Sequence, residues 1–400
     1  MPDLRSGAIS AAAFMAGLPW RLRGHGKPLA PDDPALKRVV IIKPCCMGDV
    51  LMSTAAVAAL RNALPDAHIA YAVAPWSRLC IENNPSISSI EDSPVGRKTS
   101  TTADHMRFGR LLRQGNYGAA LVLDRSPLLN MVPYLAGIPV RAGLDSDNRG
   151  LALTHPVACP PSKVRHEAEW YLETVRALGL EAPGDNAYLE FYPTEQDRTE
   201  AGAALAQAEE ESEAGLVCIH LGGGVNPGMT LLSKRWHPAG WARVADWLAE
   251  TYETNIVLLG GPGKEDREAT DAVKAALFPA TRPYVTDLVG KLGWGALGAA
   301  IERCRVFLGN DTGAMHLATA VRAPVVAVFG PTDPARYGPW DPSGRSRVVA
   351  PGPGGRSEAG SLRKAAAEGG EYHNAVSAEA VWAAVQETYA LSTKGERVRV

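Results

Sequence analysis

A strand, a polar turn, a helix and a second strand follow one another in residues 306–339, and this stretch constrains the fold more than any other. We predict a short apolar strand at Val306–Leu308 and a turn at Gly309–Gly313. A helix at Ala314–Val321 and a buried strand at Pro324–Phe329 come next. This pattern is half of a doubly wound α/β unit of the kind that binds nucleotides.

The turn before that helix carries Asp311, Thr312 and Gly313. Backbone N–H groups at a helix N-terminus have no partner within the helix and, with the helix dipole, suit a phosphate. Asp311 and Thr312 would equally serve as simple helix caps. A second loop, Gly330–Asp333, follows the next strand and favours a ligand at this edge. His316 lies one turn into the helix, where it would either face the ligand or hold the loop by a hydrogen bond.

A second strand, turn and helix begin at Arg38. The continuously apolar strand Arg38–Lys43 ends in a loop that contains Cys45, Cys46, Met47 and Gly48, and a helix is predicted at Val50–Ala63. Asp49 stands where this helix begins, so it is either a general base for a hydroxyl or a helix cap. A cysteine nucleophile beside the helix start is the weaker interpretation, because no partner histidine is identifiable nearby.

The chain has 400 residues, which favours two domains. Strands alternate with helices in both halves, and this alternation indicates parallel sheets. We therefore predict an α/β protein with two Rossmann-like, doubly wound domains that face each other across a cleft. The predicted parts are an N-terminal arm at 1–37, a first domain at 38–193, a polar helical connection at 194–213 and a second domain at 214–400 that ends in a helix.

The second half supplies further groups for a bound diphosphate. Glycines follow its first two strands, at Gly222–Gly224 and Gly260–Gly263, the latter including Gly261. Lys234 and Arg235 lie in the loop after the first of these strands, and a lysine there suits phosphate oxygens, although a surface lysine would look the same. Glu265 either accepts from ribose hydroxyls or complements the dipole of its own helix.

The composition excludes several classes of protein. The formal net charge is -2, so the chain lacks the basic excess of a general nucleic-acid binder. The six cysteines include no CxxC pair, and we predict neither a zinc site nor a disulfide framework. No run of 18 apolar residues occurs. The apolar segment Ile9–Trp20 is either a helix that lies on a membrane surface, a helix that packs on the protein, or a disordered arm. A P-loop and a GxGxxG dehydrogenase fingerprint receive little support.

Four segments in the same chain order resemble the heptosyltransferases of glycosyltransferase family 9. They are Lys43–Asp49, Lys234–Pro238, Gly309–Ala318 and Phe329–Pro334, and the similarity runs from about Arg38 to Trp340. The resemblance implies the GT-B architecture, with the acceptor held mainly by the first domain and the sugar nucleotide by the second. It also implies an inverting, single-displacement transfer from an ADP-sugar, usually ADP-heptose, to the inner core of lipopolysaccharide.

Several residues match the family's motifs one by one. Asp49 corresponds to the proposed catalytic base, Lys234 to the lysine that contacts phosphate and Asp311–Gly313 to the donor-binding turn, while Glu265 falls near an acid that contacts ribose. The resemblance implies neither a metal nor a cofactor besides the ADP-sugar donor. It implies a glycan or glycolipid acceptor, no nucleic acid, and a place in the cytoplasm, either free or in peripheral contact with the inner membrane.

The chain departs from the family pattern at Cys45 and Cys46, where small hydroxyl residues are usual. This departure and the unmatched arm 1–37 leave the natural acceptor open. Two alternatives therefore remain. One is a GT-B enzyme that uses another nucleotide sugar for a secondary-metabolite or other acceptor, and the second is a catalytically silent nucleotide-binding module. The presence of both Asp49 and Lys234 argues against silence.

Overall fold

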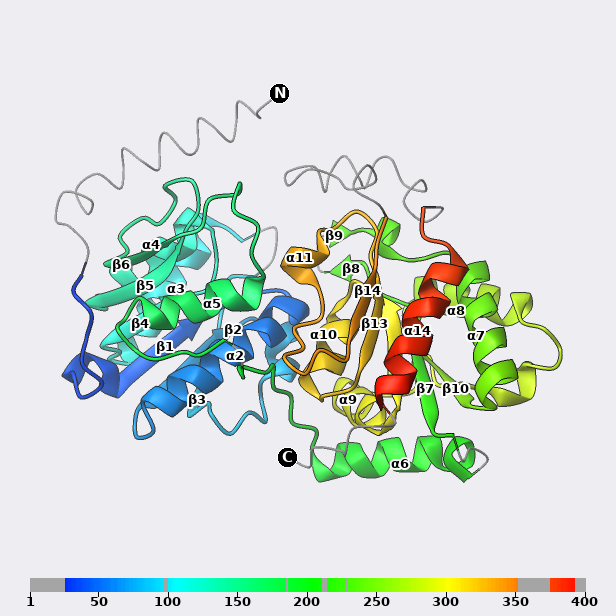
Figure 1. The fold of residues 1–400 in the computed structure, drawn as a ribbon. Helices are drawn as coiled ribbons and strands as arrows, with labels where there is room; N and C mark the ends of the chain where they lie inside the picture. The colour runs from blue at the N-terminus through cyan, green and yellow to red at the C-terminus, as the bar shows by residue number, and fades with distance from the viewer. Residues whose placement is uncertain are drawn as a thin grey trace. The chain divides into compact units, whose positions relative to one another are not determined.

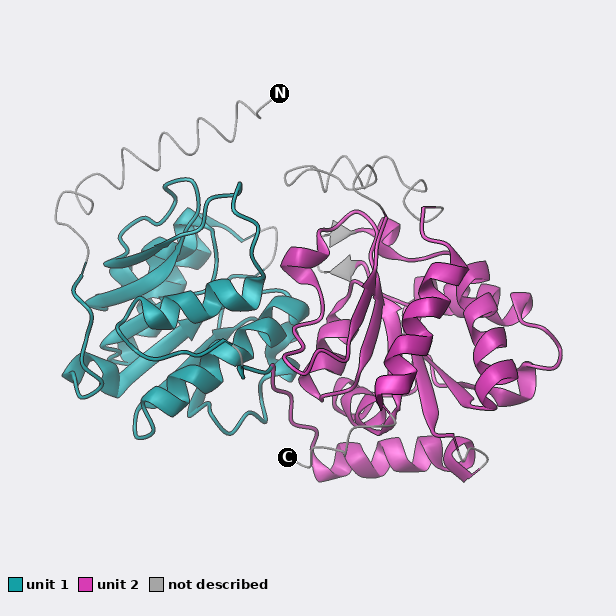
Figure 2. Ribbon diagram, viewed as in Figure 1, with its two compact units in different colours: residues 1–188 teal, residues 189–400 magenta. Residues whose placement is uncertain are grey.

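The chain divides into two compact units, Met1–Tyr188 and Leu189–Val400 (Figure 2). The computed structural model describes residues 26–96, 100–184, 186–210, 214–226, 229–351 and 375–392. The apolar segment Ile9–Trp20 and residues 352–374 lie outside the described residues.

Unit 1 is built on a six-stranded parallel sheet in the order β3-β2-β1-β4-β5-β6 (Figure 1). The strands are β1 (Arg38–Ile42), β2 (His68–Val73), β3 (Ser89–Asp92), β4 (Ala119–Val122), β5 (Val140–Asp145) and β6 (His155–Ala158). The helices are η1 (Pro34–Lys37), α2 (Met47–Ala63), η2 (Pro75–Cys80), α3 (Thr102–Gln114), α4 (Pro127–Leu135) and α5 (Glu167–Arg176). Helix α5 packs against α2, and α3 packs against α4.

Unit 2 repeats this arrangement with a parallel sheet in the order β11-β10-β7-β12-β13-β14. Its strands are β7 (Leu216–His220), β10 (Asn255–Leu259), β11 (Val285–Asp287), β12 (Val306–Asn310), β13 (Val325–Val328) and β14 (Arg347–Val349), and β8 (Val225–Asn226) pairs with β9 (Met229–Thr230) outside the sheet. Its helices are α6 (Glu195–Glu210), η3 (Leu232–Lys234), α7 (Pro238–Tyr252), α8 (Lys264–Ala276), η4 (Arg282–Tyr284), α9 (Trp294–Arg303), α10 (Gly313–Ala320), α11 (Pro334–Tyr337) and α14 (Ala378–Ser392). Helix α6 packs against α9.

Strand order reverses at the same point in both sheets. In unit 1 the chain runs outward from β1 to β2 and β3, then returns to start again at β4; in unit 2 it does so at β7 and β12. Open α/β sheets bind ligands at the carboxyl ends of the strands where the order reverses, which are β1 and β4 in unit 1 and β7 and β12 in unit 2. The predicted α/β fold with two Rossmann-like units is confirmed.

The central strands match the prediction, but three edge strands were missed. The short strands β3, β6 and β14 have half-exposed, mixed sequences because each lies at a sheet edge, and they lack the continuous apolar run of a buried strand. Strand β5 includes the polar Arg141 next to its first residue. Its polar Arg141 is tolerated there because the guanidinium bonds to the carbonyls of Ile138 and Ala152.

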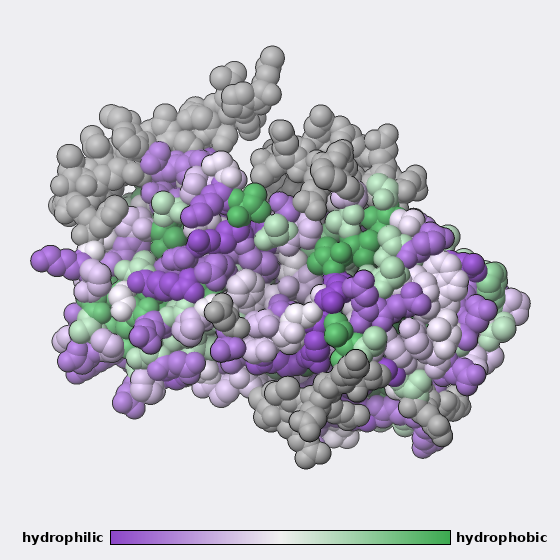
Figure 3. All heavy atoms as spheres, viewed as in Figure 1, coloured by the Kyte–Doolittle hydropathy of each residue, from purple (hydrophilic) through white to green (hydrophobic). Residues whose placement is uncertain are grey.

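The hydrophobic core of each unit is made by the strand interiors and the helix faces that cover them. Val40 and Ile42 of β1 and Ile219 of β7 are fully buried. On the face seen in Figure 3, hydrophilic residues cover much of both units, and hydrophobic residues form smaller groups among the hydrophilic ones. Within the described residues, no helix is both long and apolar enough to cross a membrane.

Candidate functional site

Lys43 connects two carboxylates at the strand-order reversal of unit 1. It follows β1 directly, and its Nζ lies 3.5 Å from Oδ2 of Asp49 and 3.3 Å from Oδ2 of Asp124. Asp49 comes from the first turn of α2, whereas Asp124 follows β4. The Lys43 side chain is 8% exposed, and those of Asp49 and Asp124 are 27% and 25% exposed. Two acids that share one buried cation leave a local excess of negative charge.

Burial and charge act in opposite directions on these groups. Burial raises the pKa of Asp49, and the charge of Lys43 only partly opposes that shift. At Lys43 burial lowers the pKa, but Asp49, Tyr171 and Asp124 outweigh burial and hold the pKa well above its ordinary value. Lys43 is therefore a permanent cation, and Asp49 is a carboxylate with an increased affinity for a proton. This is the electrostatic setting of a general base.

The end of the β1–α2 loop and the first turn of α2 are partly exposed. Cys45, Cys46, Met47, Gly48 and Asp49 are all of intermediate exposure. Cys46 is the residue at the N-cap of α2, so the helix begins three residues before the predicted Val50. Asp49 is therefore the third helical residue and does not cap the helix.

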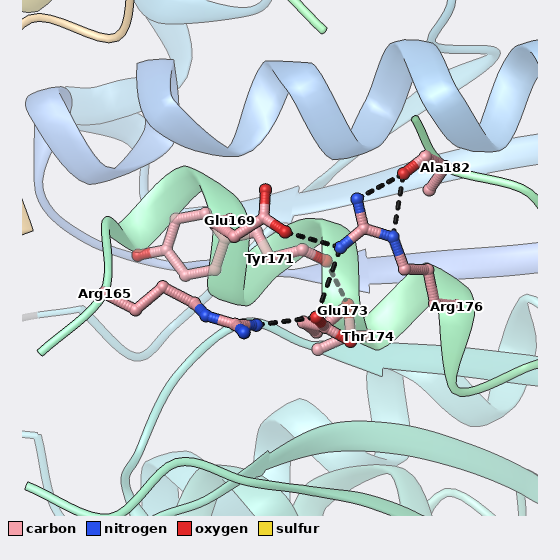
Figure 4. Close-up of polar contacts among 7 residues, drawn as sticks. All are labelled: Arg165, Glu169, Tyr171, Glu173, Thr174, Arg176 and Ala182. Carbon is pink, nitrogen blue, oxygen red and sulfur yellow. Dashed lines mark hydrogen bonds and ion pairs between the residues drawn. The ribbon is translucent and has the colours of Figure 1, made fainter. Parts of the chain in front are cut away.

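Helix α5 contributes buried side chains next to this site. Its first residue, Glu167, is 1% exposed at the side chain and forms an ion pair of 2.8 Å with Arg125, which adjoins Asp124. Tyr171 of the same helix is buried, with Nζ of Lys43 5.9 Å from its ring centroid. Figure 4 shows Arg176 of α5 reaching Glu169 at 2.6 Å and Glu173 at 3.3 Å while it also bonds to the carbonyl of Ala182. These contacts fix the helix that carries Glu167 and Tyr171.

Lys234 and Asp311 meet at the strand-order reversal of unit 2. Nζ of Lys234, in η3, lies 2.7 Å from Oδ2 of Asp311, which follows β12. The same oxygen accepts a hydrogen bond from Thr332, in the loop after β13. The Asp311 side chain is 4% exposed and that of Lys234 is 20% exposed. The turn and the lysine, which the sequence predicted as separate site residues, are thus joined by an ion pair.

Asn310 holds the lysine-bearing loop against the sheet. Its Oδ1 accepts from the backbone N–H of Trp236 at 2.8 Å, and its amide nitrogen donates to the carbonyls of Leu221 and Gly222 at 3.3 Å. The ends of β7 and β12 and the segment after Lys234 are therefore connected by one buried side chain. This side-chain amide fixes the backbone position from which the Lys234 side chain extends.

Arg235 forms a second cationic point next to Lys234. It pairs with Asp266 of α8 at 2.5 Å and donates to the carbonyl oxygens of Gly223 at 2.8 Å and Glu265 at 2.7 Å. Asp266 also accepts from the N–H of Gly261 at 2.7 Å. One arginine thus ties the loops after β7 and β10 together.

The glycines after β7 are required by close packing. A Cβ at Gly222 would lie 2.2 Å from a carboxylate oxygen of Asp266, and one at Gly223 would lie 1.9 Å from Cγ2 of Thr312. Gly223 also has a φ of +106°, which side-chain-bearing residues rarely adopt. These glycines let the backbone approach both the acid and the helix start.

Three buried polar atoms around this edge have no hydrogen-bond partner among the described residues. They are Nδ1 of His220 at the end of β7, Oγ of Ser233 in η3 and Oγ1 of Thr312 at the N-cap of α10. Each residue is less than a tenth exposed. Burial lowers the pKa of His220 to about 4, so the imidazole is neutral at pH 7. Buried polar groups are normally satisfied, and such a group near a helix N-terminus suits a polar ligand.

The other residues predicted for this site take a smaller part in these contacts. Glu265 is exposed in the first turn of α8 and contacts Arg235 only through its carbonyl oxygen, whereas the neighbouring Asp266 supplies the carboxylate that pairs with Arg235. His316 is buried within α10, and Gly313 is the first residue of that helix. Among the described residues no group of three or more His, Cys, Asp or Glu side chains could hold a metal ion.

Sequence reasoning missed Lys43, Asp266, Asn310 and His220 as site residues. Each of Lys43, Asn310 and His220 stands at the carboxyl end of a central buried strand. A polar residue that ends an apolar strand was therefore the available signal. Asp266 had no such mark, because an acid in the first turn of a helix is common.

The sequence matches the model of glycosyltransferase family 9 (heptosyltransferase) over residues 105–351. The chain is 26% identical to lipopolysaccharide heptosyltransferase 2 of Escherichia coli strain K12 over 317 residues. This aligned region covers 78% of this chain and 87% of the relative. The fold is similar to a glycosyl transferase family 9 structure from Veillonella parvula, with a TM-score of 0.72, 22% identity and coverage of 92% of this chain and 100% of the other. The structure of E. coli ADP-heptose lps heptosyltransferase II superposes with a TM-score of 0.66 at 22% identity, covering 89% and 99%.

Proposed function

Because the chain belongs to glycosyltransferase family 9, it is a glycosyltransferase, and we propose that it moves a heptose from an ADP-sugar to a glycan hydroxyl. Its heptosyltransferase relatives support heptose transfer in lipopolysaccharide assembly in general. The proposed acceptor is the lipopolysaccharide core or another cell-surface glycan. An acceptor of this kind would bring the enzyme to the cytoplasmic face of the inner membrane.

The donor diphosphate is proposed to bind at the carboxyl ends of β7 and β12. Lys234 and Arg235 supply two positive charges there, and the N-terminus of α10 supplies backbone donors next to Thr312. The unpartnered atoms of His220, Ser233 and Thr312 would gain partners from a bound donor. These cations would also stabilise the charge that develops on the departing ADP, so the proposal needs no metal ion.

Asp49 is proposed as the base that activates the acceptor. Its carboxylate would take the proton of the attacking hydroxyl while that oxygen bonds to the anomeric carbon and the bond from this carbon to the ADP oxygen breaks. Attack opposite the leaving group inverts the anomeric configuration. Lys43 would keep Asp49 ionised despite its burial, and the second carboxylate, Asp124, raises its basicity.

One observation carries the proposal. The acid pair around Lys43 in unit 1 and the ion pair between Lys234 and Asp311 in unit 2 occupy the same topological position in two sheets of identical order. One position suits proton removal and the other suits a diphosphate. Cys45 and Cys46 lie beside Asp49, where the family usually has small hydroxyl residues. A glycan other than the lipopolysaccharide core is therefore a second candidate acceptor.

A transfer assay tests the proposal. Purified protein is incubated with ADP-heptose and heptose-deficient lipopolysaccharide core in the presence of EDTA, and the product is followed by mass spectrometry. We expect one heptose added per acceptor, with an anomeric configuration by NMR opposite to that of the donor. Retention of configuration would contradict the single displacement, and transfer only from another nucleotide sugar would replace the donor assignment.

A further inference from the structure

We propose that the outer surface of helices α3 and α4 in unit 1 docks on a membrane that contains anionic phospholipids. This surface, called the α3–α4 patch, is made of three apolar side chains and three arginines: Met106, Leu128, Leu135, Arg107, Arg110 and Arg113. Binding to lipid requires no glycosyl transfer. Its purpose, which is to bring the enzyme to a lipid-linked acceptor, rests on the proposed function.

Large apolar side chains are exposed on both helices. Met106 of α3 is 50% exposed, and Leu128 and Leu135 of α4 are 45% and 39% exposed. Tyr134, next to Leu135, is 43% exposed. Four of the ten large hydrophobic side chains that the described residues expose therefore lie on these two helices. A single exposed apolar residue is ordinary, whereas a group of them marks an interaction surface.

The packing of the two helices brings these side chains together. Helix α3 packs against α4 (Figure 1). A Cβ at Gly109 would lie 3.1 Å from Cβ of Leu135, and Arg113 donates to the carbonyl oxygen of Leu135 at 2.6 Å. Met106 lies one turn before Gly109 on the same side of α3, and Leu128 lies two turns before Leu135 on the same side of α4. The exposed apolar side chains thus belong to one surface.

The same surface carries a positive charge. Arg107, Arg110 and Arg113 are exposed and recur every three residues, which places them along one side of α3. The two helices contain a single acid, Asp104, and its carboxylate accepts hydrogen bonds from Thr101. Three arginines and one aspartate give these helices a net charge of +2 with histidine taken as neutral, whereas the whole chain carries -2. The positive charge is therefore concentrated locally.

Apolar side chains next to arginines suit the surface of an anionic bilayer. Exposed apolar groups enter the boundary between headgroups and acyl chains, and basic residues are attracted to anionic headgroups. An arginine can keep its apolar stem in that boundary while its guanidinium reaches a phosphate. Charge and apolar exposure thus favour the same partner.

Co-sedimentation of the full chain with vesicles of phosphatidylethanolamine and phosphatidylglycerol tests the docking. We expect binding at least about tenfold tighter than to vesicles of phosphatidylcholine alone, and weaker binding as salt rises. Arg107→Gln combined with Arg110→Gln should weaken binding about tenfold or more. Met106→Ser combined with Leu128→Ser should weaken it about threefold to tenfold. Both variants should keep the melting temperature of the unaltered protein, because the substituted side chains are exposed.

Two matched controls lie in unit 2. Phe278→Ser removes an apolar side chain that is 53% exposed, and Arg282→Gln removes an exposed arginine. Neither should change vesicle binding. Unchanged binding by both α3–α4 variants, or equal binding to phosphatidylcholine, would overturn the proposal. A dimer without vesicles that Met106→Ser with Leu128→Ser dissociates, together with no vesicle binding, would assign the patch to a second copy of this chain and also overturn it.

A transfer assay separates this inference from the proposed function. With heptose-deficient lipopolysaccharide embedded in the anionic vesicles, the double arginine variant should transfer heptose at least about tenfold more slowly than the unaltered protein. With the same core freed from its lipid, the two rates should be equal. Equal rates on the vesicles would show that docking does not serve the reaction. If vesicle binding depends on the patch but neither acceptor is glycosylated, the docking surface stands and the proposed function fails.

Discussion

The two units use the same sheet order to hold different sets of charges. In unit 1, a single buried cation, Lys43, is shared between Asp49 and Asp124. In unit 2, Lys234 and Arg235 each have a carboxylate partner and lie close to the N-terminus of α10. The sheets have the same order, so topology decides where a ligand binds, and the few residues that end the central strands decide which chemistry is possible there.

The largest effect should come from the acidic side of this comparison. Asp49→Asn removes the proton acceptor but keeps the size of the side chain, so the transfer rate should fall about 10²- to 10⁴-fold. Affinity for ADP, measured by calorimetry, should not change, because Asp49 lies in the other unit from the proposed donor site. Asp92→Asn is the matched control, since Asp92 is an exposed acid of the same unit. A rate within about threefold of the unaltered enzyme would remove Asp49 from the role of base.

A substitution among the cations of unit 2 should change the affinity for ADP. Lys234→Ala removes a charged donor from the proposed diphosphate site, and ADP affinity should fall about 10- to 100-fold, the equivalent of about 1.5–3 kcal/mol. Adenosine, which carries no phosphate, should bind the variant and the unaltered protein equally. Lys274→Ala on α8 removes a lysine that pairs with Asp287 and should leave ADP binding unchanged. Equal loss of adenosine and ADP binding would show that Lys234 shapes the pocket and does not contact phosphate.

The interaction between Lys43 and Asp49 should be visible as pH dependence. The charge of Lys43 lowers the pKa of Asp49 against the effect of burial, so Lys43→Met should raise that pKa further. A carboxylate base is lost as pH falls through its pKa, and the acid limb of the kcat/KM profile should therefore move to higher pH. Arg78→Met, which breaks an exposed ion pair with Asp92, is the control. An acid limb that stays in place would mean that another group sets the profile.

The smallest effect concerns the unpartnered hydroxyl of Thr312. Thr312→Val keeps the shape and removes an atom that has no partner among the described residues, so the free energy of unfolding should change by less than about 1 kcal/mol. ADP affinity should fall about threefold to tenfold if the donor supplies the missing partner. Thr319→Val in the same helix breaks a bond of 3.0 Å to the carbonyl of Met315 and should do the reverse. Unchanged ADP binding by Thr312→Val would exclude this hydroxyl from the donor site.

Much of the fold was readable because its central strands are buried on both faces. Strands such as β1, β7 and β13 are continuous apolar runs followed by glycine-bearing turns and helices. The edge strand β3 reads Ser-Ile-Glu-Asp, and nothing in that pattern distinguishes it from a loop until β2 is present to pair with it. Local sequence therefore predicts elements that bury themselves and misses those that depend on a neighbour.

The candidate site divides in the same way. Asp49, Lys234 and the turn Asp311–Gly313 were predicted from strand–turn–helix patterns and from the family resemblance, and their catalytic and donor-binding roles remain predictions. The pairing of Lys234 with Asp311, 77 positions apart, could not be read from the chain because it depends on how η3 folds back to β12. The same holds for Lys43 with Asp124, which meet only when β1 and β4 lie side by side.

Calorimetric titration with ADP, GDP and UDP, in EDTA, tests the central claim most directly. The account predicts that ADP binds at least about tenfold more tightly than GDP or UDP, that EDTA makes no difference, and that Lys234→Ala weakens the binding of ADP. Preference for GDP or UDP, a requirement for a divalent metal, or no binding of any of the three would contradict the assignment of an ADP-sugar to the strand-order reversal of unit 2.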